Sequence, residues 1–266
     1  MKFEDIIYDK PWAGIEGAAR IMINRPQLRN AFRGKTAVEL QQALEDAAFD
    51  LGVGVIVLTG AGDKAFCSGG DFTDVGQKSP RYSPEIAHIL DVHRLIREAP
   101  KPVIAAVNGY AIGGGHVLHV ICDLTIASET AIFGQTGPRV GSFDAGFGSA
   151  YLARVIGEKK AREMWFLCRR YTAQEAYQMG LVNKVVPADQ LEEETKKWCR
   201  EILNLSPTAL RYLKASFNAF TDSIFGIETM SMHSLMDYYK TEEAQEGMKS
   251  WLEKRPPNWA KYRGGF

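Results

Sequence analysis

A run of three glycines followed by an apolar, helix-forming segment constrains this chain more than any other feature. The stretch from Gly109 to Asp144 reads GYAIGGGHVLHVICDLTIASETAIFGQTGPRVGSFD, so Gly113, Gly114 and Gly115 lead directly into HVLHVICDL. The first turn of a helix leaves backbone N–H groups without an intrahelical acceptor, and glycine lets a ligand approach that backbone closely. The segment predicts either a site for an oxygen that gains negative charge or a tight turn that allows close packing.

Charge and cysteine usage restrict the class of protein. Among 266 residues, Lys+Arg and Asp+Glu both number 32, so zero net charge implies no general attraction to nucleic acid. The four cysteines are far apart and form no C-x-x-C pair. With no recognisable signal peptide, they indicate reduced thiols in a cytoplasmic protein. No apolar run approaches the roughly 18 residues that span a bilayer, so no membrane association is expected.

The first half of the chain predicts alternating strands and helices, and the second half predicts mostly helices. This alternation indicates an α/β core with right-handed crossovers. The expected strands are Ile6–Tyr8, Ala19–Ile23, Val53–Leu58, Val103–Val107, Leu124–Ala127, Ala131–Phe133 and Lys184–Val186. The expected helices are Thr36–Ala48, Pro84–Arg97, Lys159–Leu167, Ala173–Met179, Asp189–Leu203, Pro207–Phe220, Ile224–Tyr238 and Glu242–Leu252.

Five segments together resemble the crotonase (enoyl-CoA hydratase/isomerase) superfamily. They read INRPQLRNAF, GAGDKAFCSGGD, KPVIAAVNGYAIGGG, AIFGQTGPRVGSFDAG and QEAYQMGLVNKVV, and they are spread over nearly the whole chain. The resemblance implies an α/β spiral of ββα turns over residues 1–200 and a helical C-terminal region, residues 201–266, for trimer formation and active-site closure. It also implies a hexamer built as a dimer of trimers, a coenzyme A thioester substrate and no tightly bound cofactor. The backbone N–H groups of Gly70 and Gly114 would hold the thioester oxygen and stabilise an enolate.

The type of crotonase follows from residues that are missing. Hydratases carry two glutamates for adding water, and the matching positions hold Val117 and Gly137, which cannot transfer a proton. The chain instead resembles the branch that contains 1,4-dihydroxy-2-naphthoyl-CoA synthase and 2-ketocyclohexanecarboxyl-CoA hydrolase. Both reactions pass through a thioester enolate next to a second carbonyl group.

In that branch, the resemblance implies two groups of side chains around the reacting atoms. A glycine at position 137 leaves room for bicarbonate as the base, with Gln135, Thr136 and Trp165 matching the residues that hold it; Trp165 is otherwise a buried aromatic in helix packing. Ser142, Asp144 and Tyr239 match residues near the second carbonyl, and Asp144 is otherwise the cap of a helix that begins near Ala145.

The loop after Gly70 separates the two candidate reactions. Synthases follow GGD with glutamine and a basic segment, whereas this chain has FTDVGQKSPRYSPE, in which Phe72 replaces the glutamine. Without those cations, a free carboxylate on the substrate is held less well. The hydrolase also lacks the basic segment, so we predict hydrolytic ring opening of a cyclic 2-ketoacyl-CoA. The synthase is the alternative, because TGPRVGSFDAG is closer to its pattern.

The remaining assignments are contacts with substrate or coenzyme A and residues with packing roles. His116 and His119 lack a third ligand at metal spacing, so we expect packing and no metal site. Met230, Met232 and Met236 favour helix core or a subunit contact over a binding surface. A non-catalytic relative that binds coenzyme A or RNA is the alternative from another class. The resemblance assigns substrate or coenzyme A contacts to Arg33, Lys64, Ala65, Cys67, Ser68, Asp71 and Phe72, although Arg33 and Lys64 could be solvated charges and Cys67 a small buried residue.

Overall fold

The strands of this chain form two sheets. The computed structural model describes residues 2–71 and 87–263. The larger sheet has the order β1-β2-β3-β5-β7-β10 and is parallel except for the β1–β2 pair. Its strands are β1 (Ile6–Asp9), β2 (Ala18–Ile23), β3 (Val55–Gly60), β5 (Val103–Val107), β7 (Leu124–Ser128) and β10 (Lys184–Val186). The smaller sheet consists of β4 (Ala65–Cys67), β6 (Tyr110–Ile112), β8 (Ile132–Gly134) and β9 (Arg170–Thr172).

The chain alternates between the sheets and thereby forms a spiral. Strands β3 and β4 are followed by helix α2 (His88–Glu98), β5 and β6 by helix α3 (Gly114–Val120), and β7 is followed by β8. Each turn adds one strand to each sheet, with β3, β5 and β7 adjacent in one and β4, β6 and β8 adjacent in the other. The predicted α/β spiral of ββα turns is confirmed.

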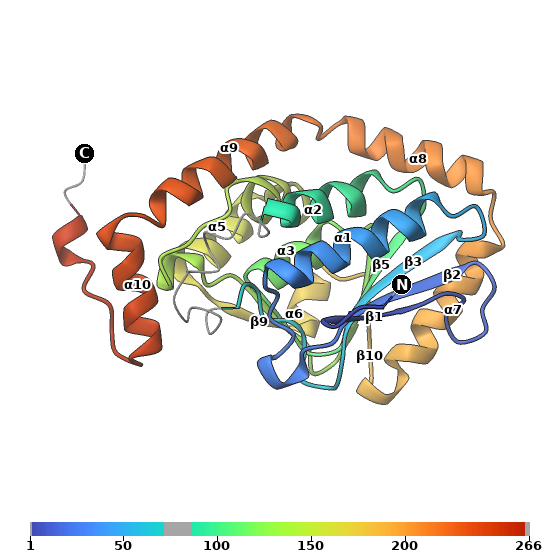
Figure 1. The fold of residues 1–266 in the computed structure, drawn as a ribbon, viewed down its shortest axis with the longest axis horizontal. Helices are drawn as coiled ribbons and strands as arrows, with labels where there is room; N and C mark the ends of the chain where they lie inside the picture. The colour runs from blue at the N-terminus through green and yellow to red at the C-terminus, as the bar shows by residue number, and fades with distance from the viewer. Residues whose placement is uncertain (1, 72–86, 264–266) are drawn as a thin grey trace.

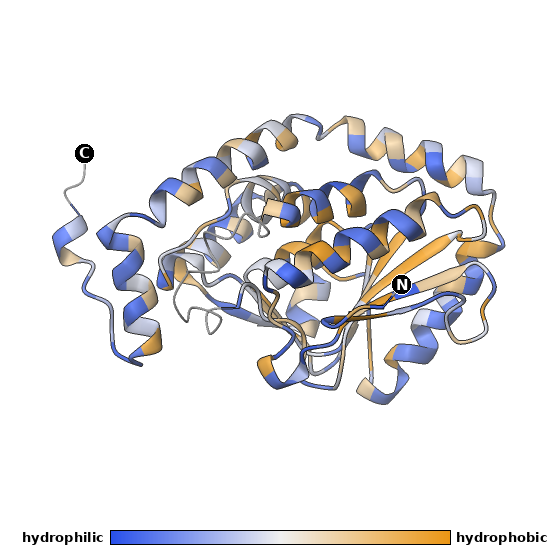
Figure 2. Ribbon diagram, viewed as in Figure 1, coloured by the Kyte–Doolittle hydropathy of each residue, from blue (hydrophilic) through white to orange (hydrophobic). Residues whose placement is uncertain are grey.

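Both faces of the larger sheet are buried, as the continuous apolar run of β3 predicts. Ile56 and Leu58 belong to a core cluster with helices α1 (Gly34–Phe49) and α2, whereas Val55 and Val57 belong to a cluster with α7 (Leu191–Leu203). Figure 1 shows α1 and α2 on one side and α7 on the other, and Figure 2 shows the hydrophobic colour concentrated in the strands between them. Each such side chain contributes about 1.5–3 kcal/mol on burial.

Three C-terminal helices extend along the edge of this core. Helix α8 (Pro207–Ala219) begins as predicted, since the Ser206 hydroxyl accepts the N–H of Ala209 at 3.3 Å. It is anchored by buried Lys214, whose ammonium lies 2.7 Å from Asp123. Helix α9 (Ser223–Tyr238) then passes over the molecule towards α10 (Glu242–Leu252) (Figure 1). Smaller helices complete the chain: α4 (Leu152–Ile156), α5 (Glu158–Leu167), α6 (Ala173–Gln178), the π-helix η5 (Gly146–Tyr151) and the 3-10 helices η1 (Pro26–Leu28), η4 (Gly137–Arg139), η6 (Ala188–Gln190) and η7 (Ala260–Tyr262).

The sequence analysis misses strands β4, β6 and β9. Each contains three residues, which is too short for an alternating pattern to be recognised. The longer predicted elements are present with end shifts of a few residues; the first part of the expected helix Pro84–Arg97 lies outside the described residues. No helix among the described residues is long and apolar enough to cross a membrane.

Candidate active site

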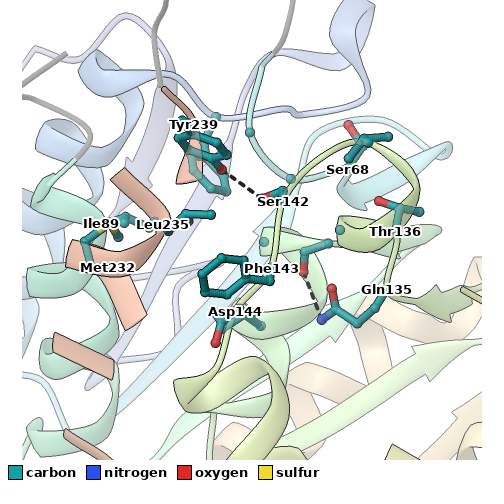
Figure 3. A pocket seen from close by; sticks show the side chains of 18 of the residues that line it. Ser68, Ile89, Gln135, Thr136, Ser142, Phe143, Asp144, Met232, Leu235 and Tyr239 are labelled. Carbon is teal, nitrogen blue, oxygen red and sulfur yellow. Dashed lines mark hydrogen bonds between the residues drawn. The ribbon is translucent and has the colours of Figure 1, made fainter. Parts of the chain in front are cut away.

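A cavity of about 170 Å³ lies where the loops after β4, β6 and β8 meet helices α2 and α9. The glycine loops form one wall, the 142–144 segment forms another, and side chains of α9 close the cavity (Figure 3). Met232 and Met236 are among those side chains, whereas Met230 is exposed. Met232 packs against the hydrophobic core, as predicted, and also lines this cavity, as does Met236.

The two glycine loops come together as predicted. Gly70 and Gly114 both line the cavity, and a Cβ atom built on neighbouring Gly69 would lie only 3.1 Å from the backbone nitrogen of Gly114. Gly113 has φ +57° and ψ −124°, a conformation that L side chains rarely adopt. Gly114 is the first residue of α3, so its N–H has no acceptor within that helix. The arrangement can present two N–H groups to one oxygen of a bound molecule.

The positions of the hydratase glutamates hold no acid. Val117 is buried, and a Cβ atom on Gly137 would lie 2.6 Å from the Ser142 carbonyl oxygen and 2.9 Å from the Trp165 ring. A glutamate at position 137 would collide with both groups. The two-glutamate arrangement for adding water is therefore excluded by geometry as well as by sequence.

The predicted bicarbonate residues all line the cavity. The Trp165 indole N–H donates to the Gly148 carbonyl at 2.5 Å. The buried Gln135 amide donates to Nδ1 of His116 at 3.2 Å and to the Gly113 carbonyl at 3.4 Å. Glycine at position 137 allows the Ser142 carbonyl and the Trp165 ring to pack closely against it, and bicarbonate stays a prediction. Thr136 lines the cavity, and Trp165 has the packing role that was its alternative.

Ser142 and Tyr239 line the cavity and form a hydroxyl pair. Their oxygen atoms are 2.8 Å apart, and one hydroxyl donates to the other (Figure 3). Ser142 follows η4, whereas Tyr239 is the C-cap of α9, so the pair joins segments 97 residues apart. Such a pair can donate to a carbonyl oxygen that gains charge.

Asp144 caps the turn that follows it and also lines the cavity. Its Oδ1 accepts the N–H groups of Gly146 at 3.0 Å and Gly148 at 2.9 Å, and its side chain lines the cavity. Burial and, next, the negative charge of Glu228 raise the pKa of Asp144 from 3.8 to about 6. No described residue bonds to the other oxygen, Oδ2, so that oxygen can exchange a proton with a bound molecule.

The sequence analysis does not identify two residues of the cavity, His93 and Glu228. Both are buried and line the cavity, and Nδ1 of His93 lies 3.0 Å from Oε1 of Glu228. Burial alone would raise the pKa of Glu228, but the hydrogen bond and charge interaction with His93 outweigh burial and lower it. One signal was available: Glu228 lies four residues from Ile224 and from Met232, on an otherwise apolar helix face.

The assigned coenzyme A contacts fall into different environments. Ser68 and Asp71 line the cavity, although Asp71 is buried and paired with Arg25 at 2.8 Å. Arg33 forms ion pairs with Asp5 at 2.8 Å and Glu4 at 2.9 Å. The contact of Arg33 with coenzyme A stays a prediction.

Strand β4 and its flanks carry the other assigned contacts. Lys64 is exposed, and Ala65 is buried with its carbonyl bound to Asn30 at 2.6 Å. Burial raises the pKa of the Cys67 thiol to about 12, in agreement with an unreactive packing residue. All four cysteines are free and buried. Phe72 lies outside the described residues.

The paired histidines after the glycines pack as expected. His116 and His119 are buried with ring centroids 4.8 Å apart, and desolvation lowers the pKa of His116 to about 3. Across the described ranges, no three His, Cys, Asp or Glu side chains gather as metal ligands.

Comparison with known proteins places this site in a family. The family model described as "Enoyl-CoA hydratase/isomerase" matches residues 14–262. An enoyl-CoA hydratase from Mycobacterium avium subsp. paratuberculosis K-10 is 29% identical with a TM-score of 0.83, covering 97% of this chain and 99% of that one. An enoyl-CoA hydratase from Bacillus anthracis is 31% identical with a TM-score of 0.76, covering 96% and 98%. A monofunctional enoyl-CoA isomerase from M. smegmatis is 31% identical with a TM-score of 0.70, covering 82% and 94%. The chain belongs to the enoyl-CoA hydratase/isomerase family, the crotonases.

Proposed function

We propose that this crotonase opens the ring of a cyclic 2-ketoacyl-CoA by hydrolysis, with 2-ketocyclohexanecarboxyl-CoA as the representative substrate. The observation that carries the proposal is that two groups of hydrogen-bond donors line one cavity. Gly70 and Gly114 form the first, and the Ser142–Tyr239 hydroxyl pair forms the second, with Asp144 in the wall beside it. The substrate carries two reacting oxygens, one on the thioester carbonyl and one on the ring ketone, and each requires hydrogen-bond donors.

Asp144 is suited to activate the water. A general base works best when its pKa lies near the operating pH, and burial together with Glu228 raises the pKa of Asp144 to about 6. At neutral pH most of the carboxylate is ionised and still accepts a proton readily. Two backbone N–H groups hold Oδ1 in place and leave Oδ2 for the water.

The reaction then conserves every atom of substrate and water. Asp144 takes one proton of water while the water oxygen bonds to the ketone carbon, whose oxygen is stabilised by Ser142 and Tyr239. The bond between the ketone carbon and Cα breaks, and its electron pair forms the thioester enolate held by Gly70 and Gly114. Asp144 returns the proton to Cα, giving a dicarboxylic acid with one end still joined to coenzyme A.

Glu228 and His93 line the same cavity as Asp144 and act on it through charge. Because His93 bonds to Glu228 at 3.0 Å, the glutamate remains ionised, and its charge opposes ionisation of Asp144. The pair thereby sets how basic Asp144 is without contacting the reacting atoms.

No bicarbonate is needed in this scheme, since Asp144 supplies the base. The same two groups of donors also suit the condensation of o-succinylbenzoyl-CoA. The segment TGPRVGSFDAG, which is closer to the synthase pattern, is the observation that favours this alternative. The two reactions differ by gain or loss of water, which makes them separable by mass.

The deciding experiment incubates the purified enzyme with 2-ketocyclohexanecarboxyl-CoA in H₂¹⁸O, with and without bicarbonate, and follows products by mass spectrometry. We expect gain of one water with one ¹⁸O in the new carboxylate, independent of bicarbonate. Asp144→Asn and Tyr239→Phe should abolish the product, whereas the neighbouring control Tyr238→Phe should retain it. Loss of water from o-succinylbenzoyl-CoA in a parallel incubation would identify the synthase instead.

We also propose that the chain assembles as a dimer of trimers. Helix α8 exposes four large apolar side chains, Tyr212, Leu213, Phe217 and Phe220, and exposed apolar clusters mark association surfaces. Light scattering should give six times the 29.6 kDa chain mass, and Phe217→Glu should lower it; a monomer at micromolar concentration would contradict this proposal.

A further inference from the structure

A second cavity of about 410 Å³ lies against α4 and α5 and is open to solvent, since Phe166 in its lining is 71% exposed. Phe143, Asp144 and Trp165 line both cavities, which are therefore adjacent. Pockets for small molecules commonly measure about 300–1,000 Å³. The second cavity lies within that range, whereas the first cavity, at about 170 Å³, is smaller.

The lining of the second cavity is mainly apolar. Four alanines keep it open, and the Trp165 and Phe166 rings and Pro138 supply further apolar surface; the alanines are Ala145, Ala150, Ala153 and Ala161. Arg162 and Glu158 at its edge pair with one another at 2.5 Å. Apart from Asp144, the lining therefore offers no unpaired charge to a ligand.

Of the residues shared by the two cavities, Trp165 is held in place and Phe143 is less tightly packed. Trp165 is buried and held by its hydrogen bond to Gly148. Phe143 is only partly buried and packs against Tyr238 with ring centroids 5.6 Å apart. A rotation of Phe143 would join the two cavities beside Asp144, where the acyl group reacts.

We propose that the second cavity binds an apolar substituent on the acyl group, so that the preferred substrate is an alkyl-substituted or bicyclic ketoacyl-CoA. The occupant follows from the shared lining residues, because only a group attached to the reacting acyl portion reaches both cavities. The ring chemistry rests on the proposed function, whereas the affinity of this cavity for an apolar group does not. Separate experiments can therefore refute the ring-opening activity and the binding of an apolar group.

The test measures dissociation constants of butanoyl-, hexanoyl-, octanoyl- and decanoyl-CoA by calorimetry, since these thioesters carry no ketone. Once the chain enters the second cavity, affinity should increase about fourfold per buried methylene. Ala153→Leu, which fills the cavity, should remove this gain for the long chains and leave the butanoyl-CoA constant unchanged. Lys159→Leu is the matched control, because Lys159 is exposed and outside the lining.

Two results would overturn the proposal. One is an affinity that stays the same from hexanoyl- to decanoyl-CoA. The other is an Ala153→Leu variant that binds all four thioesters like the wild type. If that variant also changes the oligomer mass measured by light scattering, the cavity is a contact between copies of the chain. Turnover of 2-ketocyclohexanecarboxyl-CoA, measured separately, reports on the proposed ring opening.

Discussion

Replacing Asp144 by asparagine should stabilise the fold while removing activity. Asparagine matches the protonated form of the side chain in shape, and its Oδ1 can still accept the N–H groups of Gly146 and Gly148. What it removes is an ionised carboxylate that burial and Glu228 disfavour, as the raised pKa of about 6 indicates. Active sites commonly carry destabilising features of this kind.

The magnitude follows from the two pKa values of Asp144. Below its ordinary value of 3.8, the carboxyl group is neutral in both states and costs nothing. Above about pH 6 it is ionised in both states, and the folded state carries the full penalty, which appears as pH rises between these values. Linkage gives about 0.5 kcal/mol at pH 4 and about 3 kcal/mol at pH 7 and above.

Urea unfolding at fixed protein concentration, from pH 4.5 to pH 8, measures this difference. The free energy of unfolding of Asp144→Asn should exceed that of the wild type increasingly as pH rises. Asp237→Asn is the control: Asp237 is exposed and hydrogen-bonded to Lys240 at 2.8 Å, so its replacement should not stabilise at any pH. A D144N variant no more stable than wild type at pH 8 would refute the claim that burial and Glu228 destabilise the carboxylate.

Three further outcomes follow from the same contacts. In the proposed reaction, kcat/KM should fall tenfold per pH unit below about pH 6 as Asp144 takes up a proton; Glu228→Gln should move this fall to lower pH, and an unmoved profile would mean that Glu228 does not act on Asp144. Gly137→Ala should destabilise the fold by about 1–3 kcal/mol, because its methyl group would lie 2.6 Å from the Ser142 carbonyl oxygen; an unchanged melting temperature would contradict this. Cys67 should stay unlabelled by a thiol reagent at pH 8 until urea unfolds the protein, since it is buried with a pKa of about 12; rapid labelling of the folded protein would contradict that.

The long elements and the glycine loops could be predicted because each depends on a local pattern. Strand β3 is a continuous apolar run and is covered on both faces, and the N-terminus of α8 carries a recognisable Ser-Pro start. Of the second sheet, only β8 was predicted, as the strand Ala131–Phe133. The strands of this sheet contain three residues each, and β4, β6 and β8 pair with one another across distant parts of the sequence.

The site residues were predicted better than their roles. Ser142, Asp144 and Tyr239 gather as expected, since a motif names side chains. A motif does not report which atoms fill the space around them. Gly137 was interpreted as room for an ion, and the structure adds that the Ser142 carbonyl and the Trp165 ring pack closely against it. Arg33 was assigned to coenzyme A, and the structure adds that it forms ion pairs with Asp5 and Glu4.

The chemistry of Asp144 depends on a helix that is distant in sequence. Helix α9 brings Glu228 towards Asp144, places Tyr239 on Ser142 and bonds Ser231 to the N–H of Ala145 at 2.8 Å. Without α9 docked, Asp144 would lose the neighbouring charge and much of the burial that raise its pKa, and it would become a weaker base. The basicity of the carboxylate is thus produced by tertiary docking, which explains why a sequence motif finds Asp144 but not the residue that makes it effective.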